Sequence, residues 1–190
     1  MRYSADIVVL DLEATSPDRD ANTIERTNII DIGAVRLDRR TLEIVDEFTE
    51  LVRPTEFEVA PHITEITGIT KEMVADKARF DEVGPRFIEW CGSRNRFFLA
   101  VWGAYYDIPL LRRECLAHEI EYRKHFVGGA LDIRSLAVAW LAENGHDTSG
   151  VTVARVLEKM QIEGDFVFHR ALDDARAEAR ILQSYHLSRR

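Results

Sequence analysis

The sequence has only two cysteines, Cys91 and Cys115, and no long hydrophobic run. Two isolated cysteines exclude a disulfide-rich scaffold and are typical of a reduced cytoplasmic compartment. No apolar stretch approaches the ~18 residues that a membrane span requires. The first apolar run, residues 7–10, is too short for a secretory signal and ends in a carboxylate. We therefore expect a cytoplasmic protein with no membrane partner.

Positive charge is also scarce, because 25 Lys and Arg residues stand against 33 Asp and Glu residues, for a net charge of −8. A protein that coats duplex nucleic acid carries a basic face, so this composition argues against that class. It does not exclude an enzyme that binds only the end of a strand. There, metal ions and a few local Arg or Lys residues can supply the positive field.

Linker-like tracts, internal repeats and low-complexity segments are absent as well, so residues 1–190 most simply form one domain. Hydrophobic patterning predicts five strands, at residues 5–13, 28–37, 42–52, 97–102 and 130–134. The short loops between the first three strands favour an antiparallel meander. Gly33 in the second strand indicates a bulge or a close approach of another backbone.

Helices are predicted from apolar spacing and from start signals. They fall at residues 62–66, from 71 onward, and at 80–90, 107–117, 134–141, 151–160 and 170–186. Three antiparallel strands followed by alternating strands and helices indicate an α/β protein. We expect a mixed sheet with helices on both sides.

Asp11 and Glu13 are two residues apart on the first predicted strand, so their side chains point to the same face. Two carboxylates on a buried strand face are costly unless a cation meets them. Paired oxygen ligands of this kind suit Mg²⁺ or Mn²⁺. The alternative is a strand that ends at Leu10, with both acids solvated. The pattern alone favours neither interpretation.

Asp107 opens a predicted helix just after the fourth strand, and Pro109 follows in the first turn. One interpretation is a helix N-cap, with proline in its preferred early position. The other places a third site carboxylate at the C-terminal end of the strand. The two roles are compatible.

The last predicted helix carries His169 just before it and two aspartates, Asp173 and Asp174, in its first turns. Asp173, Arg176 and Arg180 fall on one stripe, which is typical of a solvated, salt-bridged face. Asp174 is rotated by about 100° from that stripe. We therefore assign Asp174 to the site and Asp173 to solvent. His169, close in sequence to a site carboxylate, is a candidate general base.

These segments occur in an order that resembles a known family. Residues 11–15, Asp107 and the segment from His169 to Asp174 resemble motifs I, II and III of the DEDDh 3′–5′ exonucleases, which are DnaQ-like enzymes. Residues 28–35 are similar to the second strand of that family. The resemblance covers about residues 5–186, and the Glu-Ala-Thr form of motif I is most similar to the Eri-1/KapD-like branch.

The resemblance implies a ribonuclease H-like fold, in which a mixed five-stranded sheet is flanked by helices. It implies that Asp11, Glu13, Asp107 and Asp174 hold two Mg²⁺ or Mn²⁺ ions. His169 would take the proton of the attacking water. The products would be nucleoside 5′-monophosphates, removed one at a time from the 3′ ends of single-stranded RNA or DNA.

The resemblance also implies contacts with substrate and partners. Backbone around Ala14 and Thr15 would meet the 3′ end, and Tyr106 would pack on the terminal nucleotide. Gly103 stands where motif II often carries asparagine, so a side-chain contact is missing near that nucleotide. Asp132 stands where the family often has an aspartate. The oligomeric state is left open, and family analogy offers a homodimer as one alternative.

Other residues are candidates on charge or type alone. Arg26, Arg112 and Arg113 are possible phosphate contacts, with solvated surface as the default interpretation. Phe166 and Phe168 flank the histidine, and core packing is the default for both, with base stacking as the alternative.

Two other functions stay open at this point. One is a non-catalytic nucleic-acid-binding or partner-binding module of the same fold. The presence of all four acids and His169 argues against it. The other is a proofreading subunit of a polymerase, which would carry out the same chemistry with a partner.

Overall fold

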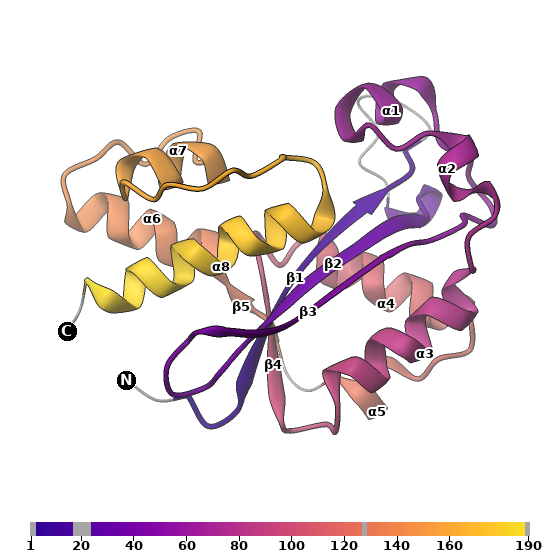
Figure 1. Ribbon diagram of the computed structural model, residues 1–190, viewed down its shortest axis with the longest axis horizontal. Helices are drawn as coiled ribbons and strands as arrows, with labels where there is room; N and C mark the ends of the chain where they lie inside the picture. Colours follow the sequence, from indigo (N-terminus) through magenta and orange to yellow (C-terminus); the bar gives the residue numbers. More distant parts are fainter. Residues whose placement is uncertain (1–2, 17–23, 127–128, 189–190) are drawn as a thin grey trace.

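The computed structural model describes residues 3–16, 24–126 and 129–188, and a five-stranded sheet lies at its centre (Figure 1). The strands run in the order β3-β2-β1-β4-β5. Their bounds are β1 Asp6–Ala14, β2 Ile29–Leu37, β3 Ile44–Leu51, β4 Phe97–Val101 and β5 Leu131–Asp132. β1, β2 and β3 form the expected antiparallel meander, whereas β4 and β5 run parallel to β1.

Helices cover both faces of this sheet (Figure 1). They are α1 Pro61–Thr67, α2 Lys71–Ala75, α3 Phe80–Cys91, α4 Asp107–Ala117, α5 Tyr122–His125, α6 Ile133–Glu143, α7 Val153–Lys159 and α8 Ala171–Leu187, with a 3-10 turn η1 at Ile24–Arg26. α6, α7 and α8 lie on one side, α3, α4 and α5 on the other, and α1 and α2 at one end. The predicted fold class, a mixed five-stranded sheet flanked by helices, is confirmed. Among the described helices, none has the length and apolar character that a bilayer crossing demands.

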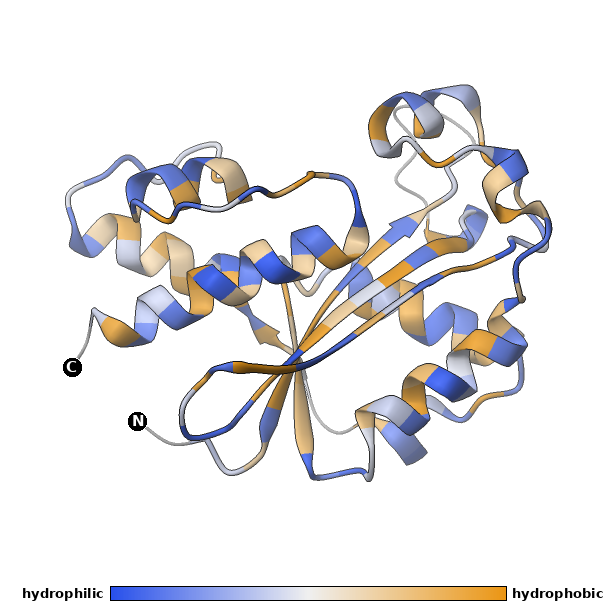
Figure 2. Ribbon diagram, viewed as in Figure 1, coloured by the Kyte–Doolittle hydropathy of each residue, from blue (hydrophilic) through white to orange (hydrophobic). Residues whose placement is uncertain are grey.

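β1 is buried on both faces, because its alternating side chains contribute to two separate cores. Val8 and Leu10 pack in the core beneath α3 and α4, and the residues on the opposite face, Ile7 and Val9, pack beneath α6 and α8. Figure 2 shows the apolar stretches of the central strands between the two helical layers. The face of Ile7 and Val9 continues along the strand toward α8 and carries the next two odd-numbered residues, which are acidic.

The C-terminal end of β1 decides between the two interpretations of Asp11 and Glu13. β1 runs to Ala14, so it does not end at Leu10, and Asp11 and Glu13 both belong to the strand. Both side chains are partly buried on the face covered by α8. The interpretation of two solvated acids beyond the strand is therefore wrong.

Gly33 is the point at which α8 meets the sheet. It pairs with Asp11 across the β1–β2 ladder. A Cβ atom added to Gly33 would lie 2.0 Å from the carbonyl carbon of Ala171 and 2.0 Å from the backbone nitrogen of Leu172. The first turn of α8 thus packs directly on the backbone of β2. Of the two roles expected for Gly33, the close backbone approach is the one observed.

Several boundaries differ from those predicted. β3 begins only at Ile44, because Leu42 adopts a φ of 63° in the preceding turn. β5 is two residues long, because the Asp132 carboxylate accepts the backbone N–H of Ser135 and so starts α6. η1 and α5 had no clear signal in the sequence.

Replacing Gly33 with alanine should destabilise the protein. The new Cβ cannot be accommodated without moving α8 off β2, and such overpacking typically costs about 1–3 kcal/mol. Urea unfolding measures the change. Gly129→Ala is the matched control, since nothing lies within 4 Å of a Cβ at that position. Equal unfolding midpoints for the two variants would contradict the close approach.

Candidate active site

A cavity of about 350 Å³ gathers side chains from distant parts of the chain. It lies where β1 and β4 end, beside the first turns of α8. Its lining residues are Asp11, Leu12, Glu13, Trp102, Tyr105, Tyr106, Asp107, Val153, His169, Asp174 and Glu178. The structure thus brings together the four carboxylates and the histidine singled out in the sequence.

Three of these carboxylates form a tight group. Asp11, Glu13 and Asp174 each offer an oxygen atom, and these atoms all lie within 4.8 Å of one another. Carboxylate oxygens without any thiolate are the donors that hard divalent cations prefer. Asp107 lines the same cavity outside this group. The residues present therefore fit a divalent cation.

The rotation of α8 separates its two aspartates. Asp174 lines the cavity and accepts the backbone N–H of Arg170 at 3.1 Å. Asp173 lies outside the cavity and pairs with Arg176 at 2.8 Å. Arg176 also binds Glu47 of β3. Asp173 is therefore part of an ion-pair network between α8 and the sheet edge rather than a freely solvated acid.

Asp107 is not the N-cap of α4. The cap is Tyr106, and Asp107 is the first helical residue, 5% exposed. Backbone N–H groups of Asp107 itself and of Leu12 in β1 favour its ionised form. Burial outweighs these bonds and raises the pKa of Asp107 to about 7. Its carboxylate is therefore held at the end of β1, in the cavity.

Burial, together with crowded negative charge, raises the pKa of the carboxyl groups in the cavity. Burial, followed by the charges of Asp174 and Asp31, raises the pKa of Glu13 to about 8, although Arg170 opposes the shift. Burial and the neighbouring carboxylates, with Glu178 first among them, raise the pKa of Asp11 well above its ordinary value. A bound cation would relieve this repulsion.

His169 stands exposed at the mouth of the cavity, with a left-handed φ of 64°. The segment that carries it is held by a buried acid from the sheet. Asp31 of β2, 2% exposed, lies 3.6 Å from the Arg170 side chain and accepts the backbone N–H of Ala171. Asp31 thus acts as a tertiary cap for α8. No pattern in the sequence indicates this role for Asp31.

The predicted substrate contacts divide into two groups. Tyr106 lines the cavity, but Ala14, Thr15 and Gly103 do not. Thr15 is fully buried, its N–H donates to the carbonyl of Asn28 at 2.8 Å, and its hydroxyl accepts from the Asn28 N–H at 2.7 Å. A contact between Thr15 and a 3′ end would therefore require other atoms, and that role stays a prediction.

Gly103 adopts a φ of 80°, and its N–H donates to Asp132. A Cβ at position 103 would lie 2.7 Å from the ring of Tyr105. The Tyr105 ring therefore occupies the space that the side chain of a larger residue at position 103 would need. Tyr105 is 71% exposed and lines the cavity, so it supplies an aromatic surface there.

The arginine and phenylalanine candidates do not line the cavity. Arg113 pairs with Glu56 at 2.7 Å and Glu114 at 2.6 Å, so it is structural rather than solvated. Arg112 lies over the ring of Tyr122. Arg26 ends the η1 turn.

The two phenylalanines beside the histidine also lie outside the cavity. Phe166 packs against the core beneath α8, in accord with its default interpretation. Phe168 is 38% exposed and contacts Phe166, with ring centroids 6.5 Å apart.

Glu178 is the acid of the cavity that the sequence reasoning missed. A signal was present, because Glu178 follows Asp174 by four residues and so lies on the same face of α8. Trp102, Tyr105 and Val153 were missed as well. They carry no charge pattern that distinguishes them from other aromatic and apolar residues.

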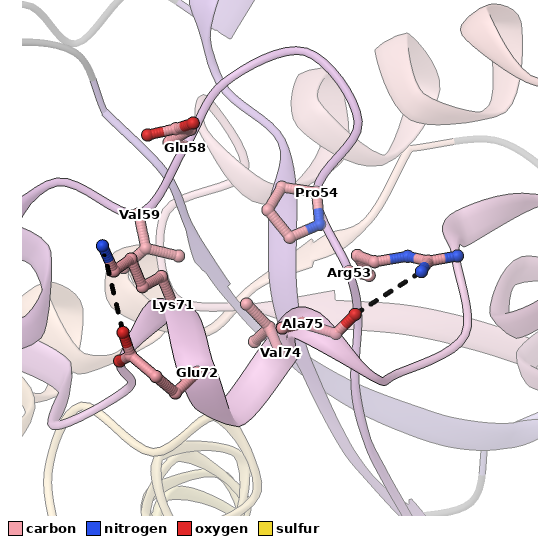
Figure 3. Close-up of a pocket in the computed structure, with 8 residues that line it drawn as sticks. All are labelled: Arg53, Pro54, Glu58, Val59, Lys71, Glu72, Val74 and Ala75. Carbon is pink, nitrogen blue, oxygen red and sulfur yellow. Dashed lines mark hydrogen bonds and ion pairs between the residues drawn. The ribbon is translucent and has the colours of Figure 1, made fainter.

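A second cavity of about 330 Å³ lies away from these carboxylates, between the segment after β3 and α2 (Figure 3). Lys71 lies 3.9 Å from Glu72, and Arg53 donates to the carbonyl of Ala75. Aliphatic side chains form much of the remaining wall. Its charged groups do not converge on one point, so the chemistry belongs to the acidic cavity.

A carboxylate cavity at the strand ends of a mixed five-stranded sheet is the arrangement of a ribonuclease H-like nuclease. Residues 8–182 match the RNase_T exonuclease family model, and the chain therefore belongs to that exonuclease family. The resemblance to the DEDDh 3′–5′ exonucleases is confirmed. Enzymes of the DEDDh group use divalent metal ions. In this chain the group of Asp11, Glu13 and Asp174 could hold such an ion.

Relatives of two kinds are found. The chain is 32% identical over 181 residues to a DNA polymerase III PolC-type protein of Thermotoga petrophila. This match covers 94% of this chain but only 12% of the relative. It is 30% identical to DNA polymerase III subunit epsilon of Aquifex aeolicus, covering 92% of this chain and 77% of the relative. It is 29% identical to 3'-5' exoribonuclease 1 of Rattus norvegicus, an Eri-1-like enzyme. That match covers 92% of this chain and 51% of the relative.

The solved structures agree with this assignment. The nuclease domain of 3'hExo, a DEDDh family member bound to rAMP, has a TM-score of 0.83 at 26% identity. The match covers 98% of this chain and 94% of that domain. The two folds are thus the same over nearly their whole lengths.

Without metal, the protein should lose stability as the pH rises from about 5 to about 8. The folded pKa values of Glu13 and Asp107, about 8 and about 7, lie above those of unfolded carboxyl groups. The folded state therefore holds extra protons in this window, and their loss removes stability as the pH rises. Urea unfolding in chelator across the pH range measures the slope.

Glu13→Gln is the control for this prediction, since it removes one titrating group and should make the slope shallower. Added Mg²⁺ should restore stability most strongly at the alkaline end, where the carboxylates are ionised. A chelated wild type whose stability rises with pH over the whole window would contradict the prediction.

Proposed function

We propose that this protein removes nucleoside 5′-monophosphates from the 3′ ends of single-stranded nucleic acid. The observation that carries the proposal is the convergence of Asp11, Glu13 and Asp174 within 4.8 Å, in a cavity shared with Asp107 and His169. The family and the DEDDh neighbour bound to rAMP, a nucleoside monophosphate, support it.

In this proposal Asp11, Glu13, Asp107 and Asp174 hold two divalent cations, Mg²⁺ or Mn²⁺. When bound, such ions stabilise the negative charge that develops on the attacking and leaving oxygens. The four carboxylates come from β1, α4 and α8. Rigid elements therefore fix their positions before substrate binds.

His169 takes the proton of the attacking water. Its exposed position at the cavity mouth gives it access to solvent, and its left-handed backbone is held by the capped start of α8. It donates a backbone N–H toward Asp174, which fixes the histidine segment relative to the carboxylates. The imidazole can therefore accept a proton next to the carboxylates without serving as a metal ligand itself.

Aromatic side chains on the same cavity wall position the strand end. Tyr105 and Tyr106 follow β4 and line the cavity with Trp102. Exposed aromatic rings stack on nucleobases without sequence preference. This wall suits an unpaired terminal nucleotide, whose base is free to stack, and supports single-stranded RNA or DNA as substrate.

A digestion panel with a matched pair of variants tests the function. End-labelled single-stranded and duplex RNA and DNA, with a 3′ hydroxyl or a 3′ phosphate, are incubated with Mg²⁺, with Mn²⁺ or with chelator. We expect mononucleotides from single strands with a free 3′ hydroxyl, and none in chelator. Asp174→Asn should lose activity by orders of magnitude, whereas Asp173→Asn should stay near wild type because it removes only a partly exposed ion pair.

Two results would count against the proposal. Release of oligonucleotides from the 5′ end would show the wrong polarity. Full activity in Asp174→Asn with loss in Asp173→Asn would show that the cavity is not the catalytic site. Circular dichroism of both variants controls for folding.

His169→Ala should lower the turnover rate by roughly 10²–10⁴-fold, the usual contribution of a positioned acid–base group. Metal affinity, measured by calorimetry, should be unchanged because the imidazole is not a ligand. Rates are compared at saturating metal. A variant that loses metal affinity but recovers its rate at saturating metal would identify His169 as a metal ligand instead.

A polymerase-associated proofreading exonuclease is the second candidate. The PolC-type and epsilon-subunit relatives favour it. The chemistry would be the same, but the strand end would come from a polymerase. Preference for a mismatched over a paired 3′ terminus in the digestion panel would support this candidate over a nuclease of free single strands.

A further inference from the structure

We propose that Glu178 is a fifth cation-binding carboxylate of this site. The inference rests on the proposed function, since it takes the carboxylates of the cavity to bind divalent cations. It goes beyond the four acids and the histidine that the family resemblance assigns.

Glu178 faces the cavity from one turn further along α8 than Asp174. Its side chain is 1% exposed. Its strongest neighbouring charges are Asp107 and Asp174, and it is in turn the carboxylate that acts most strongly on Asp11. Glu178 therefore lines the same cavity as acids from β1, α4 and α8, the three elements that build the site.

The two oxygens of Glu178 differ in their surroundings. The carboxylate accepts the backbone N–H of Trp102, at the end of β4. Its Oε2 atom is buried and has no hydrogen-bond partner within the described part of the chain. A buried carboxylate oxygen without a partner is costly. Since it belongs to a side chain that lines the cavity, a cation held there would supply the missing partner.

Glu114 shows how the same chain compensates a buried glutamate elsewhere. It is also 1% exposed, but it binds Arg113 at 2.6 Å and the Asn28 amide at 2.9 Å, with His118 at 3.6 Å. No comparable cation faces Glu178 among the salt bridges of the described residues. The contrast points to an external cation as the partner of Glu178.

A purely structural role is the competing explanation, in which Glu178 serves only to hold the Trp102 backbone. Glu178→Gln separates the two roles, because its amide oxygen can still accept the Trp102 N–H while the charge is lost. Glu178→Asp keeps the charge. Glu114→Gln is the matched control, a buried glutamate outside the cavity.

The experiment titrates metal-free protein with Mn²⁺ by calorimetry and measures urea unfolding in chelator. Glu178→Gln should weaken Mn²⁺ binding by about tenfold or more. In chelator at alkaline pH, where the carboxylates are ionised, it should also raise the unfolding midpoint, because it removes a repelled and unpaired charge. Glu178→Asp should bind Mn²⁺ more tightly than Glu178→Gln. Glu114→Gln should leave Mn²⁺ affinity unchanged and lower the midpoint, because it leaves Arg113 poorly paired.

Three results would contradict the cation-binding role of Glu178. Wild-type Mn²⁺ affinity in Glu178→Gln overturns the proposal and leaves Glu178 a structural residue. Equal weakening in Glu178→Gln and Glu178→Asp also overturns it, since charge would then not matter. Absence of Mn²⁺ binding by the wild type overturns the proposed function itself, and the inference with it.

Discussion

The first turn of α8 packs on the bare backbone of β2 at Gly33, and the site depends on this contact. A Cβ there would lie 2.0 Å from the helix backbone, so only glycine permits the approach. Gly33 is paired with Asp11, and Asp174 lies in the same first turn of α8. The close packing is what brings carboxylates from the two ends of the chain within 4.8 Å. Asp31 holds the same turn through the Ala171 N–H.

This packing concentrates negative charge where water is largely excluded. Burial is the first cause of the raised pKa of Asp11, Glu13, Asp107 and Glu178. The fold therefore carries an electrostatic cost at its centre, which the hydrophobic cores on the two faces of the sheet offset. A site built in this way would favour a bound cation, because the repulsion between its carboxylates is already present before the cation arrives.

Local sequence patterns predicted a large part of this arrangement. The two-residue period of β1 placed Asp11 and Glu13 on one face, and the helical period separated Asp174 from Asp173, as the structure places them. Contacts between distant segments were not encoded locally. The burial of Thr15 against Asn28, the capping of α8 by Asp31 and the ion pairs of Arg113 all join segments that no periodicity connects. Glu178 was overlooked because a helical glutamate usually faces solvent.

The long separation between Asp11 and Asp174 also has a consequence for biosynthesis. β1 is synthesised well before α8, the last of the described helices. Until α8 docks, a nascent chain holds only Asp11, Glu13 and Asp107 of the acidic cavity, and lacks the histidine. Contacts this distant in sequence are slow to form. The acidic cavity is therefore complete only after α8 has been synthesised and has docked on β2.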